Sequence, residues 1–169
     1  MMAETEADLR SGIVALLPRL RRFAFGLCGT AHDADDLVQS AIERALKNEG
    51  QWKADTRLDS WMYKIVQNLW IDKRRRQRTR GEAAPLEDAM GQVGYDARET
   101  VEIRDAAARA LKALAALSPE IRSAASLVIV NGHSYREAAD ALDVPIGTIM
   151  SRVARARGAL EAALSSGGE

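Results

Sequence analysis

The stretch that decides the fold is residues 134–157, SYREAADALDVPIGTIMSRVARAR. Ser134, followed three residues later by Glu137, forms a capping box that predicts the start of a helix. The ring of Pro145 keeps the residue before it out of the helical region, so this helix ends before the proline. A second helix follows, capped by Thr148 or Gly147, and extends to about residue 164. The stretch therefore predicts two helices joined by a tight turn.

The second of these helices is cationic. Residues 145–158 contain three arginines and no carboxylate: Arg152, Arg155 and Arg157. A tight helix pair with a cationic second helix is typical of the helix-turn-helix that reads the DNA major groove. The alternative is an ordinary helical hairpin whose arginines are only solvated.

Charge is distributed unevenly along the 169 residues, although 24 Lys and Arg balance 24 Asp and Glu. Residues 71–80 hold six basic side chains against the single Asp72, whereas residues 81–100 hold five acids against Arg98. Net charge therefore does not indicate nucleic acid, but this segregation predicts separate surfaces for separate partners.

Several features indicate a cytoplasmic protein. Cys28 is the only cysteine, so no disulfide can form within the chain, and we expect it to be a small buried side chain. The N-terminus lacks the basic start and apolar run of a signal peptide. No stretch approaches the roughly 18 consecutive apolar residues that span a bilayer, so we expect no membrane insertion.

Helical periodicity recurs along the chain, and no stretch alternates as a strand does. Pro18 predicts a kink or a break near Leu17 in the first helix. Pro85, glycines and weak periodicity indicate a linker. We predict an all-α protein of two small helical domains, 1–80 and 97–164, joined by a flexible acidic linker, 81–96. The predicted helices span about residues 6–28, 33–48, 59–80, 97–117, 118–132, 134–143 and 148–164.

No motif indicates catalysis, a cofactor or a metal. The two histidines, His32 and His133, stand beside turns far apart in the sequence. Asp33, Asp35 and Asp36 crowd the start of a helix, where negative charge complements the helix dipole. A metal site built from these carboxylates is the alternative. We expect a protein that is not an enzyme and binds no metal or cofactor.

The predicted helix 59–80 mixes aromatic and basic residues. Aromatic rings stack on unpaired bases while cations follow the phosphates, which is how single strands are bound. The residues in this pattern are Trp61, Tyr63 and Trp70, interleaved with Lys64, Asn68, Lys73 and Arg74. We predict that the inward positions of this helix are Trp61, Ile65, Val66 and Leu69. The alternative to base stacking is therefore that Trp61, with Ile65 and Leu69 on the same face, is part of the core. The four adjacent basic residues from Lys73 repel one another unless an anionic partner binds them.

Three segments together resemble a group IV, or extracytoplasmic-function (ECF), sigma factor of bacterial RNA polymerase. They are residues 33–46 (DADDLVQSAIERAL), residues 60–76 (SWMYKIVQNLWIDKRRR) and residues 117–160, in which P-x-G-T-x-x-S-R-x-x-R-A-R is the most specific pattern. Their order and spacing match the family over nearly the whole chain apart from the tips and the linker. The resemblance implies a protein that binds the β′ and β subunits of core polymerase and directs promoter-specific initiation. It also implies promoter DNA and an anti-sigma factor as partners, and a stress-response regulon.

The resemblance further implies roles for individual residues. The domain 1–80 would correspond to sigma region 2 and the domain 97–164 to sigma region 4. The residues that would dock on the clamp of the β′ subunit are Asp36, Leu37, Gln39 and Glu43. The residues that would melt and read the −10 element are Trp52, Trp61, Lys64, Asn68, Lys73, Arg74, Arg75 and Arg76. The residues that would contact the major groove of the −35 element are Thr148, Met150, Ser151, Arg152, Ala154 and Arg155.

Two positions depart from the family pattern. Leu58 stands where an aromatic residue is frequent, which bears on the melting surface. Met150 stands where Lys or Arg is frequent, which implies a shifted −35 preference. The competing function is a stand-alone helix-turn-helix regulator, which would bind duplex DNA without polymerase and would not need the helix 59–80. An adaptor that sequesters another protein would leave Arg152 and Arg155 without a role.

Overall fold

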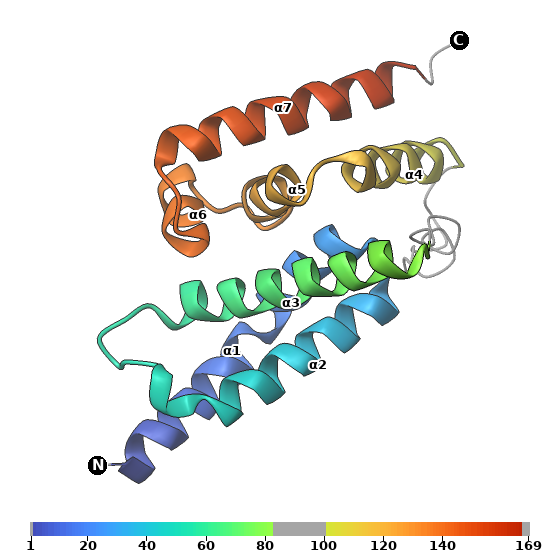
Figure 1. The fold of residues 1–169 in the computed structure, drawn as a ribbon. Coiled ribbons are helices and arrows are strands. Elements are labelled where there is room, and N and C mark those ends of the chain that lie inside the picture. The colour runs from blue at the N-terminus through green and yellow to red at the C-terminus, as the bar shows by residue number, and fades with distance from the viewer. Residues whose placement is uncertain (1, 83–100, 167–169) are drawn as a thin grey trace.

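The chain folds as two stacked layers of helices (Figure 1). The computed structural model describes residues 2–82 and 101–166, with side chains from residue 8 onward. The lower layer contains α1 (Met2–Cys28), α2 (Ala31–Lys47), the 3-10 turn η1 (Glu49–Gln51) and α3 (Leu58–Arg80). The upper layer contains α4 (Val101–Ala116), α5 (Pro119–Ala125), the π-helical turn η3 (Ser126–Val130), α6 (Tyr135–Leu142) and α7 (Ile146–Ser165). These ranges contain no strand, so the all-α prediction is confirmed.

The helix ends follow the sequence signals in most places. Ser134 and Glu137 form the predicted capping box at the start of α6. Asp143 ends α6 in the left-handed conformation, with φ of 54°. The predicted cap of the next helix is wrong, because α7 begins at Ile146, directly after Pro145, without a side-chain cap. The turn between α6 and α7 is therefore shorter than predicted, and the two helices contact each other.

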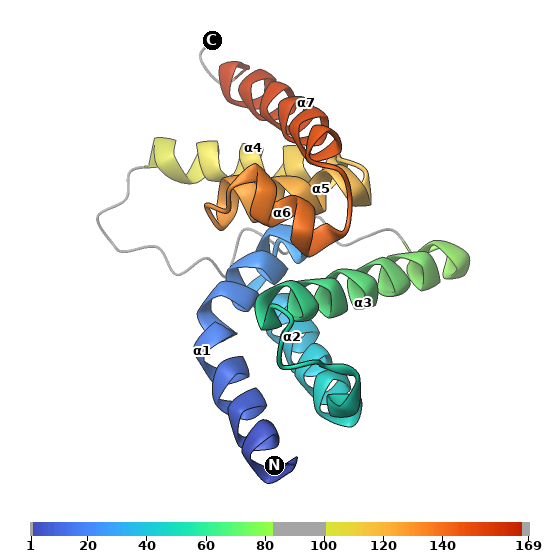
Figure 2. The ribbon, with the colours of Figure 1, turned by 90° about the vertical axis from the view of Figure 1, so that its left-hand side faces the viewer.

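The first helix is continuous through its proline. Pro18 lies inside α1, so the chain is not broken near Leu17. The helix changes direction along its length (Figure 2). A proline removes one backbone hydrogen bond from a helix and favours such bending. The bend brings the second half of α1 beneath the upper layer (Figure 2).

The core of α3 differs from the predicted one. We predicted that Trp61, Ile65, Val66 and Leu69 face inward, but only Val66 is fully buried. Trp61, Ile65 and Leu69 are half-buried against the core. The other buried positions of α3 are Met62, Tyr63 and Trp70. Both α1 and α6 pack on this helix, so its buried surface is wider than the stripe that one partner would cover.

The upper layer attaches to α1 through polar side chains that reach backbone carbonyls. The Nε of Arg122 donates to the carbonyl of Gly26 at 3.0 Å, and the hydroxyl of Ser126 donates to that of Phe23 at 2.9 Å. The amide of Asn131 donates to the carbonyl of Arg19 at 3.0 Å. Hydrogen bonds of this kind, together with one hydrophobic cluster shared by both layers, join them into a single body.

Close approach between the layers depends on a glycine. A Cβ atom on Gly26 would collide with the hydroxyl of Ser126 and lie 2.9 Å from its Cβ. Both residues are buried, so neither has room to move aside. The absence of a side chain at residue 26 therefore sets the distance between α1 and η3.

The predicted linker, 81–96, lies outside the described residues except for its first two. Gly81 ends α3 in the left-handed conformation, with φ of 68°. The start of the predicted helix 97–117 is likewise not described, and the described part of α4 begins at Val101.

Candidate nucleic-acid and partner interfaces

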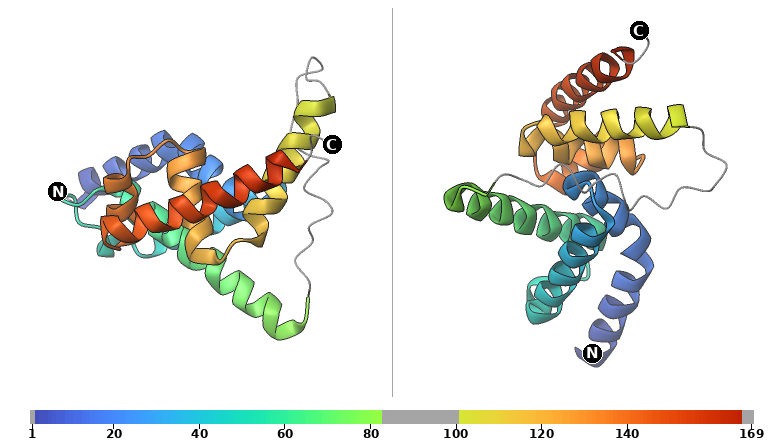
Figure 3. Two further views of the ribbon diagram at one scale, coloured as in Figure 1. Left: turned by 90° about the horizontal axis from the view of Figure 1, so that it is seen from above. Right: turned by 90° about the vertical axis from the view of Figure 1, so that its right-hand side faces the viewer.

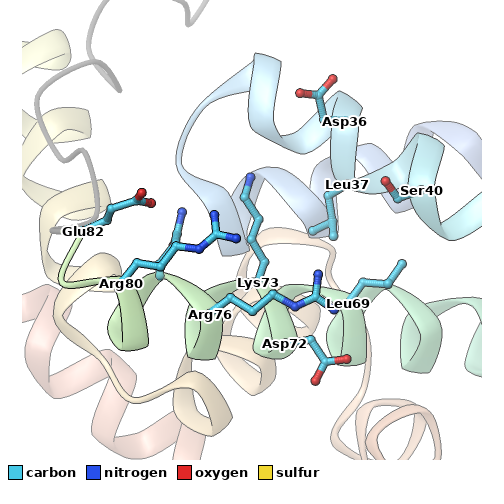
Figure 4. Close-up of a pocket in the computed structure, with 10 residues that line it drawn as sticks. Asp36, Leu37, Ser40, Leu69, Asp72, Lys73, Arg76, Arg80 and Glu82 are labelled. Atoms are coloured by element: carbon cyan, nitrogen blue, oxygen red, sulfur yellow. The ribbon is translucent and has the colours of Figure 1, made fainter.

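A groove lies between α2 and the second half of α3. It has a volume of about 480 Å³ and mixes acidic, basic and apolar side chains. Figure 4 shows Leu37 extending from α2 toward α3, with Lys73 rising from α3 beside it. The lining residues are Asp36, Leu37, Ser40, Leu69, Asp72, Lys73, Arg76, Gln77, Arg80 and Glu82.

The four residues assigned to the polymerase clamp do not share one environment. Asp36, Gln39 and Glu43 are exposed along the outer side of α2. Leu37 is 5% exposed and belongs to the core, so it supports α2 from beneath. The amide of Gln39 donates to the carboxylate of Glu43 at 3.5 Å, and His32 lies 3.5 Å from Asp36. A partner on this face would thus meet an acidic and polar helix surface.

Two of the three aspartates at the start of α2 form ion pairs with basic side chains, and the third, Asp36, lies beside His32. Asp33 lies 3.1 Å from Lys73, and Asp35 lies 2.7 Å from Arg21. Asp33 is partly buried, which raises its pKa, but hydrogen bonds from Lys73 and from Thr30 outweigh this, so the pKa is lowered. The pairing of Asp35 with Arg21 likewise lowers its pKa.

The basic end of α3 is an exposed cationic surface. Lys73, Arg75 and Arg76 are exposed, while Arg74 is half-buried with its guanidinium 5.4 Å from the ring centre of Trp70. Arg74 and Arg75 also line a cleft of about 600 Å³ between α3 and the α4–α5 junction. Adjacent like charges held at one end of a helix attract a polyanion.

The aromatic part of the prediction needs correction. Tyr63 and Trp70, which we expected to offer flat faces to bases, are buried in the core. Tyr63 makes edge-to-face contacts with Phe23 and His133, each with ring centres 5.1 Å apart. Trp52 and Trp61 are half-buried and pack against the core with one side. Only these last two tryptophans retain surface toward solvent.

The remaining residues of the −10 set lie on the exposed side of α3. Asn68 is exposed. Lys64 lies 3.3 Å from the carboxylate of Asp143, at the turn between α6 and α7. Both side chains are solvent-exposed, so this ion pair between the layers is weak.

The helix-turn-helix exposes one face of α7. Ile149, Val153 and Ala156 are buried and attach α7 to α4, α5 and α6. The residues assigned to the −35 element lie on the other sides: Met150, Ser151, Ala154 and Arg155 are exposed, and Thr148 and Arg152 are half-buried. Seen from above, no described helix lies over α7 (Figure 3, left). The predicted DNA-facing helix is therefore accessible.

Arg122 is the main feature that sequence reasoning missed. It is 3% exposed, and no carboxylate among the described residues forms an ion pair with it. Its guanidinium lies 5.5 Å from the ring centre of Trp70, and burial, with the nearby charge of Arg74, lowers its pKa to about 10. An arginine at helical spacing carries no signal that distinguishes a buried position from an exposed one.

The thiol of Cys28 is unreactive in this setting. The residue is half-buried, and burial raises the pKa of the thiol to about 11. At neutral pH the thiol is therefore protonated, so it is a poor nucleophile and a poor metal ligand.

Comparison with known proteins identifies both layers. Sigma-70 region 2 matches residues 13–80, and Sigma-70 region 4 matches residues 107–160. The ECF RNA polymerase sigma factor EcfG of Rhodopseudomonas palustris is 38% identical over 93% of this chain and 85% of its own length. SigM of Mycobacterium tuberculosis is 37% identical over 84% of this chain and 69% of its own length.

Solved structures give the same result for the fold. The sigma factor RpoE of Bartonella quintana, in complex with the anti-sigma factor NepR, matches 94% of this chain and 97% of that chain. The TM-score is 0.70 and the identity 30%. CnrH, in complex with the cytosolic domain of CnrY, matches 97% of this chain and 94% of that chain with a TM-score of 0.66 at 23% identity.

None of the described helices is both long enough and apolar enough to span a bilayer. The two matched regions, the sequence identity and the fold agree with the relatives over nearly the full chain. The chain belongs to the ECF RNA polymerase sigma factors, group IV of the sigma-70 family.

Proposed function

We propose that this sigma factor uses α2 to dock on polymerase, α3 to melt and read the −10 element, and α7 to read the −35 element. As a sigma factor, it directs promoter-specific initiation of transcription by core RNA polymerase. It acts in the cytoplasm by binding polymerase and promoter DNA, and it does not act as an enzyme. The observation that carries this assignment is the cationic, accessible face of α7 after a capped α6.

The polymerase-docking role rests on the exposed side of α2. Asp36, Gln39 and Glu43 project outward, and the adjoining groove supplies apolar and basic contacts. Leu37 contributes by fixing α2 on the core, since it is itself buried. The three exposed side chains are therefore the contacts with the β′ clamp, and Leu37 is a positioning residue.

The −10 role rests on the exposed cations of α3 and on the half-buried tryptophans. Lys64, Asn68, Lys73, Arg75 and Arg76 would follow the phosphates of a melted strand. Trp52 and Trp61 are half-buried against the core, and their exposed parts would contact a base.

The −35 role divides between the two arginines of α7. Arg155 is exposed and has exposed Ser151 and Gly158 as its neighbours on the helix surface, so it lies on the outward face. Arg152 is half-buried and has buried Ile149 and Ala156 as its neighbours, so it lies at the edge of that face. We therefore assign base reading to Arg155 and a phosphate contact to Arg152.

An anti-sigma factor is a further proposed partner. The Bartonella RpoE and CnrH structures are each complexes, with NepR and with the cytosolic domain of CnrY. The similarity of the Bartonella RpoE chain to this chain extends over both layers at 30% identity, which supports a partner of the same kind here. A stress-response regulon is proposed on the same family grounds.

One experiment separates this function from that of a stand-alone regulator. Genomic DNA fragments are incubated with the purified chain, with bacterial core polymerase, or with both, and the retained fragments are sequenced. We expect specific fragments only when both proteins are present. Retention of the same specific fragments by the chain alone would favour the stand-alone regulator.

A further inference from the structure

The first two turns of α7 expose apolar side chains within a cationic segment. Ile146 is 44% exposed and Met150 is 51% exposed. They are four residues apart and therefore adjacent on one side of the helix. Neither is needed to anchor α7, because Ile149 and Val153 fill the core beneath it.

The surroundings of Met150 allow a ligand to approach the helix closely. Gly147 and Gly158 have open space where a Cβ would stand, and Ser151 and Ala154 are short, exposed side chains. The major groove of DNA, about 12 Å wide, admits an α-helix, and these short side chains would let the backbone of α7 approach the base edges. Residues 145–160 contain three arginines and no carboxylate, so the expected occupant is a polyanion, and for a helix with the proposed −35 role that polyanion is DNA.

We propose that Met150 specifies an A·T pair in the −35 element by packing against the 5-methyl group of thymine. This inference rests on the proposed −35 role of α7. In the major groove only thymine presents a methyl group, whereas the pyrimidine of a G·C pair presents the N4 amino donor of cytosine. A thioether side chain has no donor, so opposite a G·C pair it would displace water from polar atoms without replacing their hydrogen bonds.

The position of Met150 also locates the selected pair. Met150 precedes Arg155 by five residues, or about 7.5 Å along the helix axis. Base pairs are spaced by about 3.4 Å, so the A·T pair lies within about two or three pairs of the one that Arg155 reads.

The test uses holoenzyme, assembled from core polymerase and the full chain, on a promoter mapped with the wild-type protein. Each thymine of the −35 element is replaced in turn by deoxyuridine, which removes only the methyl group. We expect one replacement to weaken wild-type binding about fourfold, equivalent to about 0.8 kcal/mol for one methyl group. The same replacement is expected to have no effect on Met150→Ala holoenzyme.

Two further variants complete the test. Met150→Lys should bind better when that A·T pair is changed to G·C, because lysine donates to guanine O6 and N7. Leu164→Ala removes another exposed apolar residue of α7 and should bind every probe as wild type does.

The inference would be overturned if wild-type holoenzyme binds the promoter but no deoxyuridine replacement affects wild type more than Met150→Ala. The proposed function would then remain intact. The inference would also be overturned if Met150→Ala binds core polymerase more weakly and its promoter preference is unchanged. That result would show that Met150 contacts polymerase and not DNA. Failure of wild-type holoenzyme to bind any promoter would overturn the proposed function as well.

Discussion

Arg122 in the upper layer donates a hydrogen bond of 3.0 Å to the carbonyl of Gly26 in the lower layer. That carbonyl lies in the last turn of α1, where no following backbone amide is available to pair with it. Arg122 also lies over Trp70, so one buried cation contacts both α1 and α3. The contact of regions 2 and 4 in this chain therefore combines specific polar contacts with the shared hydrophobic cluster.

The first prediction concerns the close contact at Gly26. Replacing Gly26 with alanine should destabilise the fold by about 1–3 kcal/mol, because the new methyl group overlaps the Ser126 hydroxyl in a packed site. Urea denaturation of the full chain measures this change. The matched control is Gly158→Ala, whose methyl group meets no neighbour within 4 Å. That variant should be more stable by about 0.5–1 kcal/mol, because alanine favours a helix over glycine. Equal effects of the two substitutions would show that the layers do not contact each other at Gly26.

A second prediction concerns pH. The Nε2 atom of His133 lies 2.9 Å from a guanidinium nitrogen of Arg19, which can only donate, so Nε2 accepts. The proton of the neutral ring is then on Nδ1, which donates to the carbonyl of Leu127 at 3.2 Å. Burial, followed by the charge of Arg19, lowers the pKa of His133 below its ordinary value.

The sign of the effect follows from this shift. As pH falls through about 6.5, the unfolded chain takes up a proton at His133 that the folded chain does not. The contribution of His133 to stability is therefore complete above pH 6.5 and is lost as pH falls toward its folded pKa. Urea midpoints measured between pH 7.5 and pH 5.5 should fall in the wild type and in His32→Gln, but less in His133→Gln. An equal fall in all three proteins would exclude His133 as the cause.

Polymerase docking gives the third prediction. The double variant Asp36→Lys, Gln39→Ala should weaken binding to core polymerase by roughly 1–3 kcal/mol, if these exposed residues anchor the interface. Its urea midpoint should stay close to that of wild type. Leu37→Ala, by contrast, should destabilise the fold by about 2–5 kcal/mol, because it leaves a cavity in the core. Unchanged core binding by the double variant would remove α2 from the interface.

The fourth prediction separates the two arginines of α7. Arg155→Ala should relax sequence preference at one −35 position by about 1–3 kcal/mol, as expected for loss of a bidentate contact with guanine. Arg152→Ala should weaken all promoters alike and reduce the salt dependence of binding by about one unit of slope. Both are measured with holoenzyme on promoter variants. The reverse pattern would exchange the two roles, and normal transcription by both variants would exclude α7 from DNA reading.

The sequence was sufficient for the elements that rest on local signals. The capping box at Ser134 and Glu137 and the proline start of α5 are short-range patterns, and both are present in the structure. The helix of residues 59–80 was placed within one residue of its start. The buried face of this helix was not predicted, because Tyr63 contacts His133 and Trp70 contacts Arg122, both more than fifty positions away.

The contact between the layers could not be predicted for a related reason. Arg122, Ser126 and Asn131 are polar residues whose partners are backbone carbonyls, and carbonyls are the same at every position of α1. Gly26 looked like an ordinary helix residue until its neighbour was known. Polar side chains and a glycine therefore form the most specific contact of the fold, which hydrophobic periodicity does not reveal.

The central claim, that this chain is a sigma factor, is tested most directly by run-off transcription from a genomic library. The purified chain is added to bacterial core polymerase, and the 5′ ends of the transcripts are sequenced. We predict a discrete set of start sites that share two upstream elements, and loss of these starts when the chain is omitted. Transcripts that start at the same places with and without the chain would contradict the claim.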